Sequence, residues 1–298
     1  MRTQDRVSFK LPQLLGFELS ELVAIALVAL LYLPLMVHWY DGWLNKSISL
    51  EHEYFSHGLI GLPFAAYLVW SNRDRWQALP NTSHIGGLAL LVLGMAAYLS
   101  GLSDPINLSL SLTLAGLCLW LKGASGLRLQ AFPLLLVFLA TPTELPYLIA
   151  PYTLPLQRFI AGTAGFILLQ FGMDIQVNQI YLLVNDRVVE VAPHCSGLKM
   201  LFTSLYVGLM LLYWTGTWAS RSKTVCFVLS IFMISTTANI FRNTLLTYFH
   251  GNGHERAFAW LHEGWGGDLY SAGMLGLLVV ILYAINRWFP LFADESDT

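Results

Sequence analysis

Residues Val225–Phe249 read VCFVLSIFMISTTANIFRNTLLTYF, a run of 25 positions in which the one charged side chain is Arg242. A helix rises about 1.5 Å per residue, so this run is long enough to cross a hydrocarbon core of about 30 Å. Hydrophobic residues make up 56% of the 298-residue chain and charged residues 11%, with a mean hydropathy of +0.58. A soluble core does not absorb that much uninterrupted apolar sequence. The composition therefore predicts an integral membrane protein.

Comparable apolar runs recur along the chain, although two of them are short for a bilayer crossing. We expect an all-α polytopic membrane protein with about eight transmembrane helices and a single integral membrane domain over residues 1–298. The segment Thr153–Phe171 carries Gln157, Arg158 and Gln170 and is expected to be re-entrant or interfacial rather than spanning. The predicted spans are Leu22–Val37, His57–Trp70, Ile85–Gly101, Leu108–Leu121, Leu129–Ala140, Leu198–Thr215, Val225–Phe249 and Leu269–Phe289.

The positive charges fall on one side of the membrane if the chain weaves regularly through these spans, and the positive-inside rule makes that side cytoplasmic. The N-terminal segment 1–21 and the tail 290–298 are then cytoplasmic, and residues 141–194 are extracytoplasmic or re-entrant. Glu18 and Glu21 flank the first run, which argues against a cleaved signal peptide. The basic residues that set this orientation are Arg2, Arg6, Lys10, Arg73, Arg75, Lys122, Arg128, Arg221, Lys223 and Arg287.

A β-favouring stretch interrupts the helical pattern before residue 194. Residues Ile175–Ile180 alternate in polarity, Tyr181–Val184 continue the run, and Asn185-Asp186 form a turn signal before Arg187–Val191. The pattern predicts a small extracytoplasmic β-hairpin, with an irregular loop as the alternative.

Cys195 lies where this polar stretch meets an apolar run, in Ala192-Pro193-His194-Cys195-Ser196-Gly197-Leu198. The other two cysteines, Cys118 and Cys226, lie inside apolar runs, where thiols usually behave as inert hydrophobes. The start of a helix lowers the pKa of a thiol toward the reactive thiolate. The position of Cys195 therefore raises the hypothesis of a catalytic nucleophile, with a buried inert thiol as the alternative.

The predicted topology brings two further side chains to the level of Cys195. Arg242 lies 17 residues beyond Val225, roughly 25 Å along a helix that starts at the cytoplasmic face. His262 lies in the outer segment before the last span. Arginine holds a negative charge on an oxygen and histidine exchanges protons near neutral pH, which together suit an acyl-transfer site. An interfacial arginine bound to headgroups and a loop histidine bonded to backbone are the alternatives.

A different class of function is open at this point, because most histidines are predicted near the outer face together with four glutamates. A transporter or a metal-binding membrane protein would use such a cluster, but no familiar ligand spacing is present and no metal or other cofactor is expected. A non-catalytic membrane scaffold is a third possibility. Neither a phosphate loop nor a basic groove with aromatic residues is present, so nucleic acid is not an expected partner. The outer histidines are His38, His52, His57, His194, His250, His254 and His262.

Four sequence blocks, in order, resemble the exosortase/archaeosortase family of membrane sorting enzymes. They are Tyr54-Phe55-Ser56-His57-Gly58, Ala192–Leu198, Ala238-Asn239-Ile240-Phe241-Arg242-Asn243 and His262-Glu263-Gly264-Trp265. Lys199 stands where an arginine is frequent in the family.

The resemblance implies a catalytic set of Cys195, Arg242 and His262. We expect Asn239 and Ser196 to position the substrate, and His57 to be structural or substrate-positioning. The resemblance also implies an inner-membrane cysteine transpeptidase or protease whose active site faces outward. Its partner would be a membrane-anchored protein that ends in a Pro-Glu-Pro-type (PEP-CTERM) signal, a transmembrane helix and a basic cluster. The expected chemistry is cleavage through a thioester on Cys195.

Overall fold

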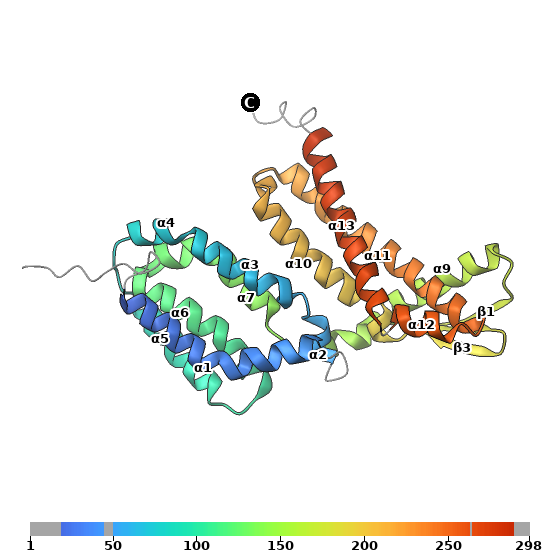
Figure 1. Cartoon of the computed structure of the whole chain (residues 1–298), viewed down its shortest axis with the longest axis horizontal. Coiled ribbons are helices and arrows are strands. Elements are labelled where there is room, and N and C mark those ends of the chain that lie inside the picture. Colours follow the sequence, from blue (N-terminus) through green and yellow to red (C-terminus); the bar gives the residue numbers. More distant parts are fainter. Residues whose placement is uncertain (1–18, 45–49, 263, 289–298) are drawn as a thin grey trace, which may run out of the picture. The chain divides into compact units, whose positions relative to one another are not determined.

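The structure is a computed structural model that describes residues 19–44, 50–262 and 264–288 (Figure 1). The chain separates into two compact units, which are described one at a time. The first unit comprises residues 1–48 and 58–143, and the second comprises residues 49–57 and 144–298. The predicted cytoplasmic tail 290–298, and all but the last few residues of the predicted N-terminal segment 1–21, lie outside the described residues.

The first unit is helical throughout its described part. Buried polar side chains connect its helices by hydrogen bonds, which are favourable in the low dielectric of a membrane-embedded core. Trp39 Nε1 donates to Asn107 Oδ1 at 2.8 Å, and Asn107 Nδ2 donates to the carbonyl of Pro142 at 3.0 Å. Its helices are α1 (Leu19–Leu44), α3 (Gly58–Ser71), α4 (Arg73–Ala78), α5 (Ile85–Tyr98), α6 (Ser103–Leu129) and α7 (Ala131–Ala140).

Lys122, which the sequence places among the solvent-facing cytoplasmic charges, is buried in this first unit. Its ammonium donates to Asn81 Oδ1 at 2.5 Å and lies 3.9 Å from the carboxylate of Glu21. A buried ammonium needs such partners because its desolvation is costly. Lys122 is therefore part of the interior of the unit.

The second unit carries every residue of the predicted site. Its elements are α2 (Leu50–Tyr54), α8 (Leu145–Ile149), η1 (Ala150–Thr153), α9 (Leu154–Gln170), β1 (Ile175–Asn178), β2 (Tyr181–Val184), β3 (Arg187–Glu190), η2 (Pro193–Cys195), α10 (Leu198–Trp214), η3 (Thr217–Ala219), α11 (Arg221–Gly251), α12 (Glu255–His262) and α13 (Trp265–Trp288). Helices α10, α11 and α13 pack around a shared apolar cluster that includes Leu212, Phe227, Ile231 and Leu278.

The predicted hairpin exists, with one strand more than the sequence indicated. Strands β1, β2 and β3 form an antiparallel sheet in that order, with Ile175 opposite Val184 and Val184 opposite Arg187. Asn185 and Asp186 both have positive φ, as the expected two-residue turn requires. A second turn at Gln179, whose φ is 58°, divides the predicted long strand in two.

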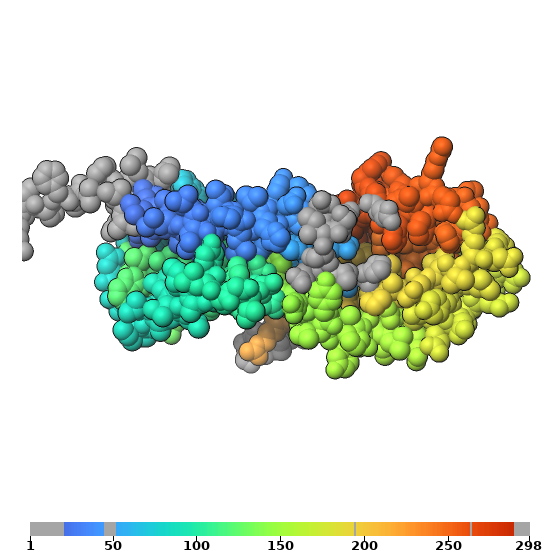
Figure 2. Space-filling model, turned by 90° about the horizontal axis from the view of Figure 1, so that it is seen from below, coloured from blue at the N-terminus to red at the C-terminus, as the bar shows by residue number. Residues whose placement is uncertain are grey.

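This sheet packs on two helices that also hold the site. Figure 2 shows the sheet residues in yellow against the light green surface of α9, and the two share an apolar cluster with Cys195. Asn185 Nδ2 donates to the carbonyl of Gly251 at 3.1 Å, and Arg187 donates to the carbonyl of His250 at 3.2 Å. The sheet is thereby fixed to the end of α11.

The count of eight transmembrane spans is confirmed only in part. All eight predicted runs are helical over most of their length. Among the helices of the described residues, four (α1, α6, α11 and α13) are both long and apolar enough to cross a membrane. Joining α7 to the helices that follow it would make five. The remaining apolar helices α3, α5 and α10 have 14, 14 and 17 residues, short of the roughly 20 that a straight crossing needs.

Candidate active site

Cys195 ends the short 3₁₀ turn η2, between the sheet and helix α10. Its backbone N–H donates to the carbonyl of Ala192 at 2.8 Å, and its side chain is buried. Helix α10 begins at Leu198, after Gly197 in the left-handed region with a φ of 85°. The thiol thus lies just before a helix start, as the sequence predicts, but inside the protein.

Two asparagines on α11 hold the backbone of Cys195. The amide nitrogens of Asn239 and Asn243 donate to the Cys195 carbonyl at 3.0 and 3.2 Å, and both side chains are buried. Residues four apart lie on one face of a helix, so the pair forms a two-pronged clamp. Asn239 is predicted to position the substrate, whereas in the structure its side-chain amide binds the backbone carbonyl of Cys195.

Gly197 allows this clamp to close. A Cβ at Gly197 would lie 2.7 Å from Nδ2 and 2.8 Å from Cγ of Asn239, closer than real Cβ atoms come. The positive φ adds a second requirement for glycine, since other L residues avoid that region. The Cys-Ser-Gly sequence is therefore explained in part by the approach of α11.

Arg242 lies between the two clamp residues on the same turn of α11. Its guanidinium donates to the carbonyls of Leu261 and His262 at 3.5 and 3.4 Å. The side chain is partly buried, and its charge acts on the Cys195 thiol. Arg242 therefore connects the region of Cys195 to the end of α12.

His262 is the last residue of α12. Its imidazole stacks on Phe258, with ring centres 5.1 Å apart and an interplanar angle of 11°. The hydrogen bond from Arg242 is accepted by the backbone carbonyl of His262, not by its imidazole. Cys195, Arg242 and His262 thus belong to one region of the second unit, with Arg242 as the common neighbour.

The resting thiol differs from the sequence-based expectation. Burial raises the pKa of the Cys195 thiol above its ordinary value, and the positive charge of Arg242 opposes this shift. The carboxylate of Glu53 raises the pKa further. Desolvation disfavours the thiolate more than the surrounding charge favours it, so the expected lowering by a helix start is wrong for this state.

Helix α2 contributes contacts that the sequence did not reveal. The hydroxyl of Tyr54 donates to the carbonyl of Pro193 at 3.5 Å, and Lys199 donates to Glu53 at 2.8 Å. Burial, with help from Glu53, raises the pKa of Tyr54 to about 12. Lys199, at the position where arginine is frequent in the family, thus connects the start of α10 to α2 through its ion pair with Glu53.

The two remaining predicted positions are buried. The Ser196 side chain is 1% exposed, and within the part of the chain that the structure describes its hydroxyl oxygen has no hydrogen-bond partner. His57 is also buried, with its ring 4.3 Å from the ring of Tyr206. Both belong to the second unit.

The histidines considered as a metal cluster are used in separate places. His250 pairs with Glu255 at 3.5 Å, and Glu255 also binds Arg187. The ring of His57 lies 4.3 Å from that of Tyr206, and the ring of His262 stacks on Phe258. Among the described residues, no group of three or more His, Cys, Asp or Glu side chains is arranged to hold a metal ion.

Asn243 belongs to the third of the four sequence blocks, but no role was predicted for it. Its signal is the i, i+3, i+4 spacing of Asn239, Arg242 and Asn243, which puts three polar side chains on one face of an otherwise apolar helix. No sequence pattern indicated these contacts of Glu53 and Tyr54, because the two residues are far from Pro193 and Lys199 in the sequence and meet them only in the folded chain.

The protein is helical with several candidate membrane spans. Its site holds a buried cysteine whose carbonyl binds two asparagines, and an arginine from the same helix turn that binds the carbonyl of a histidine. The sequence model of the transmembrane exosortase family matches residues 39–279. The chain belongs to that family, whose members act in membranes on exported proteins with C-terminal sorting signals. Comparison with curated proteins and with solved structures gave no match.

Proposed function

We propose that the chain is a cysteine transpeptidase or protease that cleaves the C-terminal sorting signal of exported proteins, of the Pro-Glu-Pro type. The cleavage takes place at the outer face of the inner membrane, with both termini of the enzyme in the cytoplasm. The substrate is a protein anchored by a transmembrane helix next to the scissile bond. The proposal rests on membership of the exosortase family together with the arrangement around Cys195.

In the proposed reaction His262 takes the proton of the Cys195 thiol, and the resulting thiolate attacks the carbonyl carbon of the scissile peptide bond. Arg242 stabilises the negative charge on the carbonyl oxygen in the tetrahedral intermediate. The C–N bond then breaks and His262 gives a proton to the departing amine, which leaves a thioester on Cys195. An amine or water takes up the acyl group and restores the thiol.

The observation that carries this proposal is the position of Arg242 between the two asparagines that bind the Cys195 carbonyl. The clamp fixes the cysteine against the same helix turn that presents the guanidinium. A fixed donor close to the nucleophile is what stabilisation of an oxyanion needs, because it avoids reorganisation during the reaction. The same guanidinium binds the carbonyl of His262 and so fixes the end of α12.

Burial raises the pKa of the Cys195 thiol, so the thiol has to be activated by the groups around it when the substrate binds. The positive charge of Arg242 lowers that pKa. Entry of a substrate carbonyl beside Arg242 places the developing negative charge next to the same cation. Proton loss from the thiol is then coupled to substrate binding rather than complete in the free enzyme.

The test is processing of a tagged exported protein that carries a Pro-Glu-Pro motif, an apolar helix and a basic cluster, co-expressed with the enzyme. Cys195→Ala is expected to abolish cleavage. Cys118→Ala removes a thiol from helix α6 of the first unit and is expected to cleave as the natural chain does.

Immunoblots of isolated membranes check that both variants accumulate to the natural level. Undiminished cleavage by Cys195→Ala at that level would refute the nucleophile. Equal loss in both variants would point to a general need for intact thiols and would equally contradict the assignment.

A further inference from the structure

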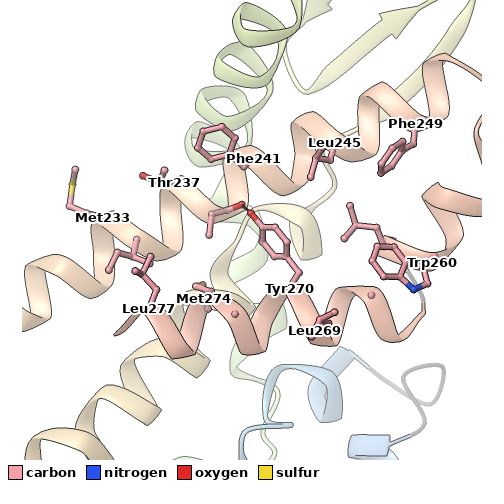
Figure 3. Close-up of a pocket in the computed structure, with 15 residues that line it drawn as sticks. Met233, Thr237, Phe241, Leu245, Phe249, Trp260, Leu269, Tyr270, Met274 and Leu277 are labelled. Carbon is pink, nitrogen blue, oxygen red and sulfur yellow. Dashed lines mark hydrogen bonds between the residues drawn. The ribbon is translucent and has the colours of Figure 1, made fainter. Parts of the chain in front are cut away.

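An apolar groove runs along one side of α11 in the second unit. Its main part has a volume of about 710 Å³, and α11, α12 and α13 line it (Figure 3). Figure 3 shows Thr237, Phe241, Leu245 and Phe249 following one another along α11, with Tyr270 on the facing helix. These α11 residues are spaced by four, so they form one continuous stripe.

The groove continues toward the start of α11. A second hollow of about 350 Å³ shares Met233 and Ile234 with the first and extends the groove to Cys226. From Cys226 to Phe249 there are 23 helical steps, which correspond to roughly 35 Å. This length slightly exceeds the hydrocarbon thickness of about 30 Å.

The lining is apolar along the whole groove. Thr237, Ser230, Tyr270 and the indole of Trp260 supply its few polar side-chain atoms, and no lining residue that the structure describes carries a charge. The hydroxyl of Tyr270 is already used, since it donates to the carbonyl of Ala238 at 2.6 Å. Such a surface suits an apolar partner.

The groove adjoins the candidate active site. Ala238 and Phe241, which line it, are the neighbours in sequence of Asn239 and Arg242. Leu261 lines it as well, and its carbonyl accepts a hydrogen bond from Arg242 at 3.5 Å. A molecule in the groove therefore lies within reach of the arginine that the proposed reaction uses.

We propose that this groove binds the transmembrane helix of the substrate and so presents the adjoining peptide bond to Cys195. This inference rests on the proposed function and adds the surface that recognises the anchor. A lipid acyl chain occupies one leaflet, about half the hydrocarbon thickness, whereas the groove covers the whole of it. A single apolar helix matches both its length and its uncharged lining.

Close packing in the groove favours a helix further. Gly273 lines it on α13, and a Cβ there would meet nothing within 4 Å. A glycine at such a position allows two helix backbones to approach closely, which is how transmembrane helices associate without a hydrophobic driving force.

The first experiment is photo-crosslinking in intact membranes, in the Cys195→Ala background so that substrate accumulates uncleaved. A benzophenone amino acid replaces Phe241, which lines the groove. In the control it replaces Phe232, which is also exposed on α11 but lies outside the lining. The probe is the tagged protein with its apolar helix, and an adduct to that helix is expected from position 241 alone.

The second experiment fills the groove. Gly273→Leu is expected to slow processing of the tagged protein at least tenfold. Gly276→Leu is the matched control, because this glycine on the same helix also has open space around it and does not line the groove. Both changes raise helix propensity, so both variants are expected to accumulate normally.

The outcomes separate the two proposals. Equal processing by the Gly273→Leu and Gly276→Leu variants, or adducts to lipid or to a second copy of the chain in place of the tagged helix, would overturn the groove assignment. The proposed function would stand if Cys195→Ala still abolished cleavage. Cleavage by Cys195→Ala would instead refute the function, whatever the crosslinks show.

Discussion

Replacing Gly197 with alanine tests whether the contact between Cys195 and α11 is what builds the site. The new Cβ would lie 2.7 Å from Nδ2 and 2.8 Å from Cγ of Asn239, so the asparagine has to move. Asn239 is 1% exposed and its amide binds the Cys195 carbonyl at 3.0 Å. Displacing it breaks that bond inside the protein, where no water replaces it.

The expected cost has two parts. A residue other than glycine at a φ of 85° costs about 1–2 kcal/mol. A buried donor left without its acceptor costs about 1–3 kcal/mol more. The free energy of unfolding should therefore fall by about 2–5 kcal/mol. Processing should fall by about 100-fold, since a shift of about 1 Å in a catalytic group has that effect.

Gly216→Ala provides the matched control. Gly216 has a φ of 69°, close to that of Gly197, but a Cβ there would meet nothing within 4 Å. It should lose only the backbone part, about 1–2 kcal/mol, and retain processing. The assays are reversible denaturation in detergent micelles and cleavage of the tagged substrate. Equal stability and equal cleavage in the two variants would refute the clamp.

Three further predictions concern the same site. Asn243→Ala should lower the free energy of unfolding by about 1–3 kcal/mol and impair processing, because it removes a buried donor to the Cys195 carbonyl. Asn252→Ala, at an exposed asparagine bonded to its own helix, should change stability by less than about 0.5 kcal/mol, and similar losses in the two would contradict the clamp. Arg242→Gln should raise the pH midpoint for iodoacetamide labelling of Cys195 in membranes, since the Arg242 charge lowers the thiol pKa; a midpoint that stays or falls would disprove this. Glu53→Gln should move the same midpoint downward, because the Glu53 carboxylate raises that pKa, and a rise would show the sign to be wrong.

The helices were the most predictable part of the molecule, because long apolar runs leave the backbone few other ways to satisfy its hydrogen bonds in a membrane. Their lengths were less predictable. The run predicted as Leu108–Leu121 belongs to α6, which covers Ser103–Leu129 and includes Lys122. The charge looked like the end of a span, yet it is buried against Asn81 and Glu21, and such pairing has no signature in local sequence.

The sheet shows a different reason for a partial prediction. The Asn185-Asp186 turn was visible because these residues tolerate positive φ. The turn at Gln179 was not, because glutamine has no such preference and takes a φ of 58° under tertiary constraint. One long predicted strand therefore became β1 and β2.

Within the site, the sequence predicted a common depth in the membrane for Cys195, Arg242 and His262 but nothing about their lateral positions. The spacing of polar residues on α11 indicated a functional face of the helix. It did not indicate that Asn239 and Asn243 bind the backbone carbonyl of Cys195. The pKa of Cys195 was unpredictable for the same reason. Its direction depends on burial by β2, α9 and α11, elements far from it in sequence.

Arg242 serves the proposed chemistry, but a charged side chain inside a membrane span has a cost in free energy. An arginine inside a span is unfavourable by about 2.5–3.5 kcal/mol on insertion scales, unless protein groups take over its solvation. Here two carbonyls at the end of α12 accept from it, and they are backbone groups that a helix end leaves without intrahelical partners. The guanidinium has further donors, and its charge acts on a thiol whose pKa burial has raised. A substrate oxygen that becomes negative would satisfy those donors better than any group recorded in the resting site. The same desolvation that holds the thiol protonated at rest would then strengthen the attraction between Arg242 and the oxyanion.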